Sequence, residues 1–142
     1  MIAVDTNLLV YAHRADAPFH SPAARVVREL VEGANLWAIP WPCIHEFLSK
    51  VTHPRIFKNP TPLARAIEQV DEWLRSPSVR TIGEPEGYFA VLSRVALDSD
   101  VTGAKIHDAR IAALCLAHGV DELLSADRDF SRFTGLSHRN PF

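Results

Sequence analysis

Short apolar runs alternate with longer helical segments along this chain, and this alternation constrains the fold more than any other feature. The runs cover residues 2–4, 35–40, 78–82 and 121–125, with a weaker candidate at 136–139. Runs this short and apolar are typical of strands buried on both faces of a sheet. Strands that alternate with helices predict an α/β domain with a short, mostly parallel central sheet.

The segments between these runs carry helix signals. We expect helices over residues 7–13, 20–33, 42–53, 61–76, 87–99 and 106–119. Ser21 is expected to cap the second helix, with Pro22 at its first position. The fourth helix repeats a Thr-Pro start, and helical spacing predicts that its buried stripe consists of Leu63, Ile67, Val70 and Leu74.

Length and composition exclude several classes of protein. The 142 residues fit a single domain over residues 1–142. Lysine plus arginine (15) nearly balances aspartate plus glutamate (17), so no global basic charge indicates nucleic acid. Cys43 and Cys115 form no paired motif, which argues against a disulfide scaffold and fits a reducing compartment. With no signal peptide and no long apolar segment, we expect a cytoplasmic protein without a membrane span.

Five acidic residues lie where ligands bind in parallel sheets, at the carboxyl ends of the strands. Asp5 follows the first predicted strand, and Asp127 and Asp129 follow the fourth. Asp108 lies in the first turn of the helix before the fourth strand, and Glu46 lies one to two turns into the helix after the second. Each acid alone has an ordinary explanation as a cap or an exposed helix residue, but together they predict one acidic rim.

Carboxylates that share a small volume need a compensating charge. Two unit charges about 5 Å apart repel by roughly 3 kcal/mol at an effective dielectric constant of about 20. A divalent cation removes this cost, and oxygen-only ligands favour magnesium or manganese over zinc. We therefore expect Asp5, Asp108 and Asp127 to bind Mg²⁺ or Mn²⁺. Such sites usually serve phosphoryl chemistry, in which the metal activates a water.

Three segments that carry these acids resemble PIN-domain ribonucleases, and most closely the VapC toxins of bacterial toxin–antitoxin pairs. They read MIAVDTNLLVYA, IHEFLSKVTHPRIF and IHDARIAALCLAHGVDELLSADRDF. The resemblance spans nearly the whole chain and places the family's four acids at Asp5, Glu46, Asp108 and Asp127. Asp129 matches a more variable auxiliary acid, Thr6 and Asn7 match polar residues that can hold a water bound to the metal, and Ser125 matches a small hydroxyl position.

This resemblance implies a three-layer α/β/α fold and a metal-dependent endoribonuclease that uses magnesium or manganese. It also implies the toxin component of a type II toxin–antitoxin system, a homodimer, and inhibition by a small VapB-like antitoxin. Phosphate contacts to the RNA substrate are expected from cationic side chains near the rim or in the segment THPRIFKNP: Arg55, Lys58, Arg110 and Arg128. In the same segment, Phe57 is a candidate for base stacking.

Other functions fit parts of the pattern. A housekeeping PIN nuclease for RNA maturation would use the same acids. A magnesium-binding receiver-type signalling module, or an aspartyl phosphotransferase, would also hold acids at a parallel sheet, but the expected partner acids are missing after the first and third strands. A catalytically inactive scaffold would not need the full acid set. Seven histidines are present, but none has zinc-site spacing, and His45 and His107 are expected to face away from their acidic neighbours.

Overall fold

The computed structural model describes residues 1–142 and forms a parallel sheet between two layers of helices. The elements in chain order are β1 (Ile2–Val4), α1 (Thr6–His13), α2 (His20–Glu32), β2 (Trp37–Pro40), α3 (Trp41–Val51), α4 (Leu63–Leu74), β3 (Val79–Ile82), α5 (Tyr88–Ser99), α6 (Lys105–Ala117), β4 (Glu122–Leu124), the 3₁₀ helix η1 (Arg128–Arg132) and β5 (His138–Arg139). The five predicted strands and six predicted helices are confirmed, with small shifts of their ends.

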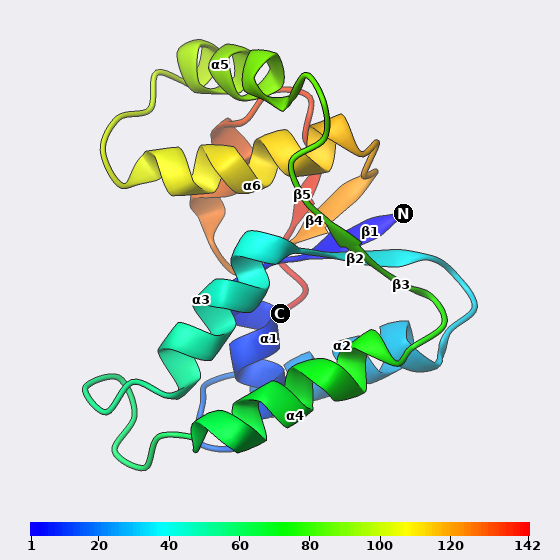
Figure 1. Cartoon of the computed structure of the whole chain (residues 1–142), viewed down its shortest axis with the longest axis vertical. Coiled ribbons are helices and arrows are strands. Elements are labelled where there is room, and N and C mark those ends of the chain that lie inside the picture. The colour runs from blue at the N-terminus through cyan, green and yellow to red at the C-terminus, as the bar shows by residue number, and fades with distance from the viewer.

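The sheet has the strand order β3-β2-β1-β4-β5, and every pairing is parallel. Crossovers between parallel strands are right-handed. The chain moves in one direction from β1 to β3 and in the other from β3 to β4. Its helices therefore fall on opposite faces, with α1 to α4 on one side and α5 and α6 on the other (Figure 1). This is the predicted three-layer α/β/α arrangement.

The strand order reverses at β1, which has β2 on one side and β4 on the other. Val4 is in register with Leu124, and the Asp5 amide donates to the Leu124 carbonyl at 3.0 Å. The first residues beyond β1 and β4, Asp5 and Ser125, therefore lie next to each other. In open parallel sheets this reversal point is where ligands bind.

The core is one cluster of 33 buried apolar residues that joins the sheet to both helical layers. Helix α6 is buried around most of its circumference because it packs between α5 and the sheet. Its predicted inward residues Ile111, Ala112, Leu114 and Cys115 are all buried. No helix is both long enough and apolar enough to cross a membrane.

The predicted cap of α2 is wrong. The helix begins at His20, and the residue before it, Phe19, has a left-handed backbone with φ of 58°. Ser21 makes no cap and lies inside the first turn. Pro22 is still tolerated there, because the first turn of a helix does not need its missing N–H. The His20 ring, which is 2.8 Å from the Tyr11 carbonyl, helps to set the position of this turn.

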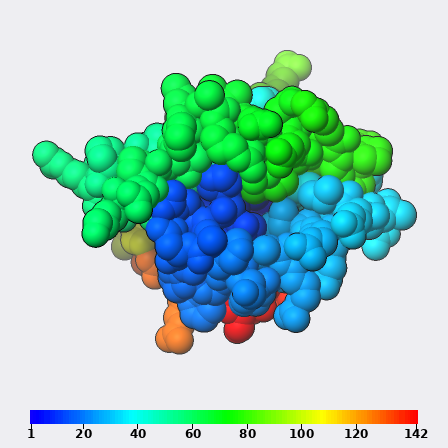
Figure 2. All heavy atoms as spheres, turned by 90° about the horizontal axis from the view of Figure 1, so that it is seen from below, coloured from blue at the N-terminus to red at the C-terminus, as the bar shows by residue number.

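The predicted buried stripe of α4 is wrong in its first half. Leu63 and Ile67 are 59% and 52% exposed, whereas Ala66, Val70 and Trp73 are buried. Trp73 packs edge-on against Phe47 of α3, with ring centroids 4.9 Å apart, and this contact fixes the rotation of the helix. Figure 2 shows α4 beside α2 on the face of the molecule seen from below Figure 1.

Candidate active site

Asp5 is the most buried acid of the predicted rim. Its Oδ2 accepts hydrogen bonds from the Ser125 hydroxyl at 2.7 Å and from the Asn7 amide at 3.0 Å. On the other oxygen, the Cys43 thiol is the weak donor, with Sγ 3.7 Å from Oδ1. Asp5 stands at the N-cap position of α1, but its side chain makes no capping hydrogen bond. The ordinary explanation of Asp5 as a helix cap is therefore wrong.

Burial raises the pKa of Asp5 to about 6. The hydrogen bonds from Ser125 and from the Thr6 backbone lower it, and the nearby carboxylates of Glu46 and Asp108 raise it by a smaller amount. The protein therefore holds this carboxylate in a place where its charge is costly. Carboxylates whose pKa is shifted by burial in this way cluster at functional sites.

Asn7 and Ser125 connect the start of α1 to the loop after β4. The Asn7 amide donates to the Ser125 hydroxyl at 3.1 Å, and its Oδ1 accepts the Ala126 N–H at 3.1 Å. The Ser125 hydroxyl also accepts the Asp127 N–H at 3.0 Å. This network fixes Asp5 and the loop that carries Asp127 relative to each other.

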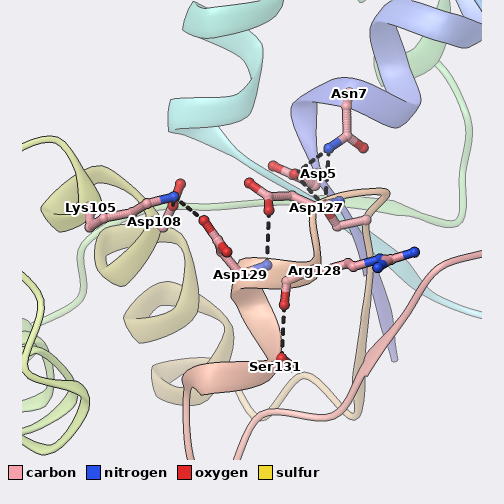
Figure 3. Close-up of polar contacts among 9 residues, drawn as sticks. Asp5, Asn7, Lys105, Asp108, Asp127, Arg128, Asp129 and Ser131 are labelled. Atoms are coloured by element: carbon pink, nitrogen blue, oxygen red, sulfur yellow. Dashed lines mark hydrogen bonds and ion pairs between the residues drawn. The ribbon is translucent and has the colours of Figure 1, made fainter.

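Three carboxylates meet beside Asp5 (Figure 3). Asp108, Asp127 and Asp129 each offer an oxygen, and these oxygens all lie within 4.8 Å of one another. Asp108 reaches this place because crossover helices run antiparallel to the strands, so α6 begins at the carboxyl edge of the sheet. Asp127 has a second role as the cap of η1, since its Oδ1 accepts the Asp129 N–H at 2.9 Å.

Lys105 lies against this cluster. Its ammonium pairs with Asp129 and lies 3.4 Å from Asp108 Oδ2 (Figure 3). The hydrogen bond from Lys105 lowers the pKa of the exposed Asp129, whereas burial raises the pKa of the half-buried Asp108 despite the opposing charge of Lys105. An internal cation thus offsets part of the repulsion in the cluster.

Glu46 faces the cluster from α3. The Thr6 hydroxyl donates to Glu46 Oε2 at 2.7 Å, and Lys50, one turn later, lies 3.0 Å from Oε1. Glu46 and Asp108 line opposite walls of a pocket of about 530 Å³ between α3 and α6. The full set of lining residues is Pro42, His45, Glu46, Ala104, His107, Asp108, Arg110 and Ile111.

The four predicted RNA-contacting cations are not gathered at one place. Arg110 lines this pocket and pairs with Glu84 at 2.7 Å. Arg128 is exposed and points away from Asp108 and Asp129 (Figure 3). Arg55 and Lys58 are exposed in the loop that follows α3, beyond the end of this helix that is farther from the pocket (Figure 1).

Phe57, the predicted stacking residue of the same loop, has one ring face covered by the Arg14 guanidinium, which lies 4.2 Å from the ring centroid. Arg14 also donates to the Asn59 carbonyl at 2.7 Å. The loop therefore packs against Arg14 at Phe57 and Asn59, and this contact covers ring surface of Phe57 that a base could otherwise use.

Sequence reasoning missed three residues beside the acids. Lys105 is three residues before Asp108, a helical spacing that could have revealed the pair. The expectation that His45 and His107 face away from their acidic neighbours is wrong, because both line the pocket together with Glu46 and Asp108. Adjacent helical residues are about 100° apart, and a pocket of this width spans that angle.

A family model described as the PIN domain matches residues 2–136. The chain belongs to the PIN domain family. Ribonuclease VapC48 of Mycobacterium tuberculosis is 35% identical over 138 residues, which are 97% of this chain and 95% of that relative. Ribonuclease VapC43 of the same organism is 35% identical over 141 residues, 99% of this chain and 95% of that relative. The resemblance found in the sequence is confirmed.

Solved structures share the PIN fold at lower identity. VapBC2 from Rickettsia felis, bound to a DNA fragment from their promoter, aligns with a TM-score of 0.72 at 19% identity and covers 99% of this chain and 98% of that chain. VapC20 of Mycobacterium tuberculosis, a sarcin-ricin loop cleaving toxin, aligns with a TM-score of 0.68 at 18% identity and covers 96% and 99%. These two structures confirm the three-layer PIN fold.

Proposed function

We propose that this PIN domain is a metal-dependent endoribonuclease and the toxin of a type II toxin–antitoxin pair, acting in the cytoplasm. The observation that carries the proposal is the meeting of Asp108, Asp127 and Asp129 beside the buried Asp5 in a chain of this family. The curated relatives named VapC ribonucleases, 35% identical over nearly the whole chain, support the toxin assignment over a housekeeping PIN nuclease.

The donor set fits a divalent cation. The cluster offers carboxylate oxygens only, and hard ions such as Mg²⁺ and Mn²⁺ prefer oxygen ligands. Its oxygens span up to 4.8 Å, close to the separation of about 4.2 Å between opposite ligands of Mg²⁺. These oxygens belong to Asp108, Asp127 and Asp129, and Asp5 lies outside that group. Asp5, Asp108 and Asp127 are the ligands we propose, with Asp129 as an auxiliary. Bound there, the ion would lower the pKa of a water and offset charge on the phosphate.

The chain's own side chains prepare the site for this chemistry. Ser125 and Asn7 hold Asp5 in one orientation, so little rearrangement is needed when a cation binds. Thr6 directs Glu46 toward the pocket, where this carboxylate can accept a proton from an attacking water. Glu46 also pairs with Lys50. This ion pair can break when substrate binds, because both side chains are more than 40% exposed.

The proposed protein partner is a VapB-like antitoxin that places a basic side chain on the acidic rim. The contact of Lys105 with Asp108 and Asp129 supports this proposal, because it shows that the rim can bind an ammonium group. We also propose a homodimer. Exposed apolar side chains offer area for association in two separate places, Leu63 and Ile67 on α4 and Phe89 and Leu97 on α5. The mass in solution, by light scattering after gel filtration, tests the dimer.

A cleavage assay tests the nuclease. Purified wild type should cut cellular RNA in Mg²⁺ or Mn²⁺ and stop in excess chelator, and cut sites should vanish in Asp5→Ala. Full activity in chelator contradicts the metal mechanism.

Expression alone should arrest growth, and coexpression with the neighbouring antitoxin should restore it. An active nuclease that does not slow growth points instead to RNA maturation. Phosphorylation of Asp5 by a small phosphodonor would favour the receiver alternative.

A further inference from the structure

The pocket between α3 and α6 combines acidic side chains with aromatic and cationic ones. Each wall carries one acid, Glu46 on α3 and Asp108 on α6, and His45, His107 and Arg110 supply donors and planar groups beside them. A volume of about 530 Å³ is within the range of about 300–1,000 Å³ that small-molecule and nucleotide sites occupy. The pocket is therefore large enough for one nucleotide beside the acids.

The two pocket histidines differ from the other five. His13, His20, His53, His118 and His138 are partly buried, and each has a ring nitrogen hydrogen-bonded to a protein atom. His45 and His107 are exposed and have no such bond, so all of their ring nitrogens are available to a ligand. The hydrogen bonds of the other five histidines give them a role in the fold. His45 and His107 have no such role.

An aromatic surface adjoins His45. The Trp41 ring lies 6.1 Å from the His45 ring, and 40% of this tryptophan is exposed. Trp41 also packs against the backbone of Gly83, where an added Cβ would lie 3.3 Å from the indole. This contact restricts the ring while leaving one part of it open. Unpaired RNA bases stack on such surfaces, on histidine rings and on arginine planes.

We propose that this pocket binds the nucleotide next to the scissile phosphate of single-stranded RNA. The base stacks on Trp41 and His45, and His107 and Arg110 bind the flanking phosphate or sugar. The proposal rests on the proposed nuclease function. If the scissile phosphate binds at the acids, the neighbouring nucleotide lies within reach of these side chains. In this proposal the pocket between α3 and α6 recognises the RNA, in place of the loop that carries Arg55 and Lys58.

The direct test follows the seven histidine side chains by NMR while the full protein, in chelator, is titrated with the ribodinucleotide ApU. We expect the ring signals of His45 and His107 to shift and the other five to stay fixed. Shifts confined to His53, whose ring accepts the Arg55 N–H, would place RNA at the loop and overturn the proposal. No shift at millimolar ApU would also overturn it.

Variants give a second readout. His45→Ala and His107→Ala should each weaken binding of a short mixed-sequence RNA in chelator by about tenfold. With metal they should raise KM and leave kcat nearly unchanged. Arg94→Ala on α5, an exposed arginine without an ion pair, is the matched control. If wild type cuts RNA and the histidine variants bind as wild type does, this proposal fails alone. If wild type cuts no RNA in any metal, the proposed function fails.

Discussion

Asp5 and Asp129 lie in one acidic rim, but their surroundings move their pKa values in opposite directions. Asp5 is buried, has hydrogen-bond donors and no cation, and its pKa rises to about 6. Asp129 is exposed, pairs with Lys105, and its pKa is lowered. The fold therefore fixes the buried half of the rim at a cost in stability, whereas the Lys105 ammonium balances the exposed half. A rigid buried half and an exposed half with a displaceable side chain suit a site that binds and releases a cation.

The largest expected effect is on activity. Asp108→Asn, which removes a proposed ligand charge at nearly constant shape, should lower RNA cleavage by at least about 100-fold, as should excess chelator on wild type. Asp98→Asn, on the exposed face of α5, is the matched control and should cut normally. Equal activity of the two variants in a gel-based cleavage assay would remove Asp108 from the site.

The next effect is on stability in chelator. Because the pKa of Asp5 in the folded protein lies above its ordinary value, the folded state holds an extra proton between about pH 4 and pH 6. The free energy of unfolding should therefore fall as pH rises through this window. Asp5→Asn should remove that dependence and stabilise the protein at pH 7 by about 3 kcal/mol, since one pKa unit corresponds to about 1.4 kcal/mol.

Urea unfolding at pH 4 and pH 7 measures this effect. Asp129→Asn is the comparison. The lowered pKa of Asp129 contributes stability that is lost only as pH falls below its ordinary value of 3.8, so this variant should keep the wild-type difference between pH 4 and pH 7. A loss of stability at pH 7 in Asp5→Asn would mean that the Asp5 hydrogen bonds outweigh its burial.

A smaller effect, a loss of stability, is expected when Asp5 loses its principal donor. Ser125→Ala removes the 2.7 Å hydrogen bond and leaves the carboxylate charged and less satisfied. The cost should be about 1.5–3 kcal/mol at pH 7 and less at pH 4, where Asp5 is protonated. Ser131→Ala, which removes an exposed bond to the Arg128 carbonyl, serves as the control. The same loss at both pH values would assign Ser125 to packing alone.

The smallest effect concerns the exposed half of the rim. Lys105→Met should bind Mn²⁺ more tightly than wild type, because a competing ammonium is gone. Exposed ion pairs contribute little because solvent screens them, so the gain should not exceed about fivefold. Calorimetric titration measures it, and Lys58→Met, exposed and far from the acids, should bind as wild type does. Weaker binding in Lys105→Met would show that Lys105 organises the cluster instead.

Local pattern predicted much of this molecule. The short apolar runs gave the strands. Asp5, Asp127 and Asp129 follow strands and Asp108 lies in the first turn of α6, as their positions in the sequence predicted. Residue spacing failed at α4, where Leu63 and Ile67 have the right period but Trp73 sets the rotation by packing on Phe47. One helix offers two apolar stripes, and only the neighbouring helix decides between them.

The sequence by itself determined the strands, the helices and the candidate acids, because hydrophobic period and chain direction are local properties. Only the tertiary structure decided that β1 lies at the centre of the sheet, so that Asp5 and Ser125 are neighbours although 120 residues apart. It also decided that Lys105 pairs with Asp129 and that His45 and His107 face one pocket. These contacts join different elements, and their energies depend on distances and burial that exist only after the helices pack on the sheet.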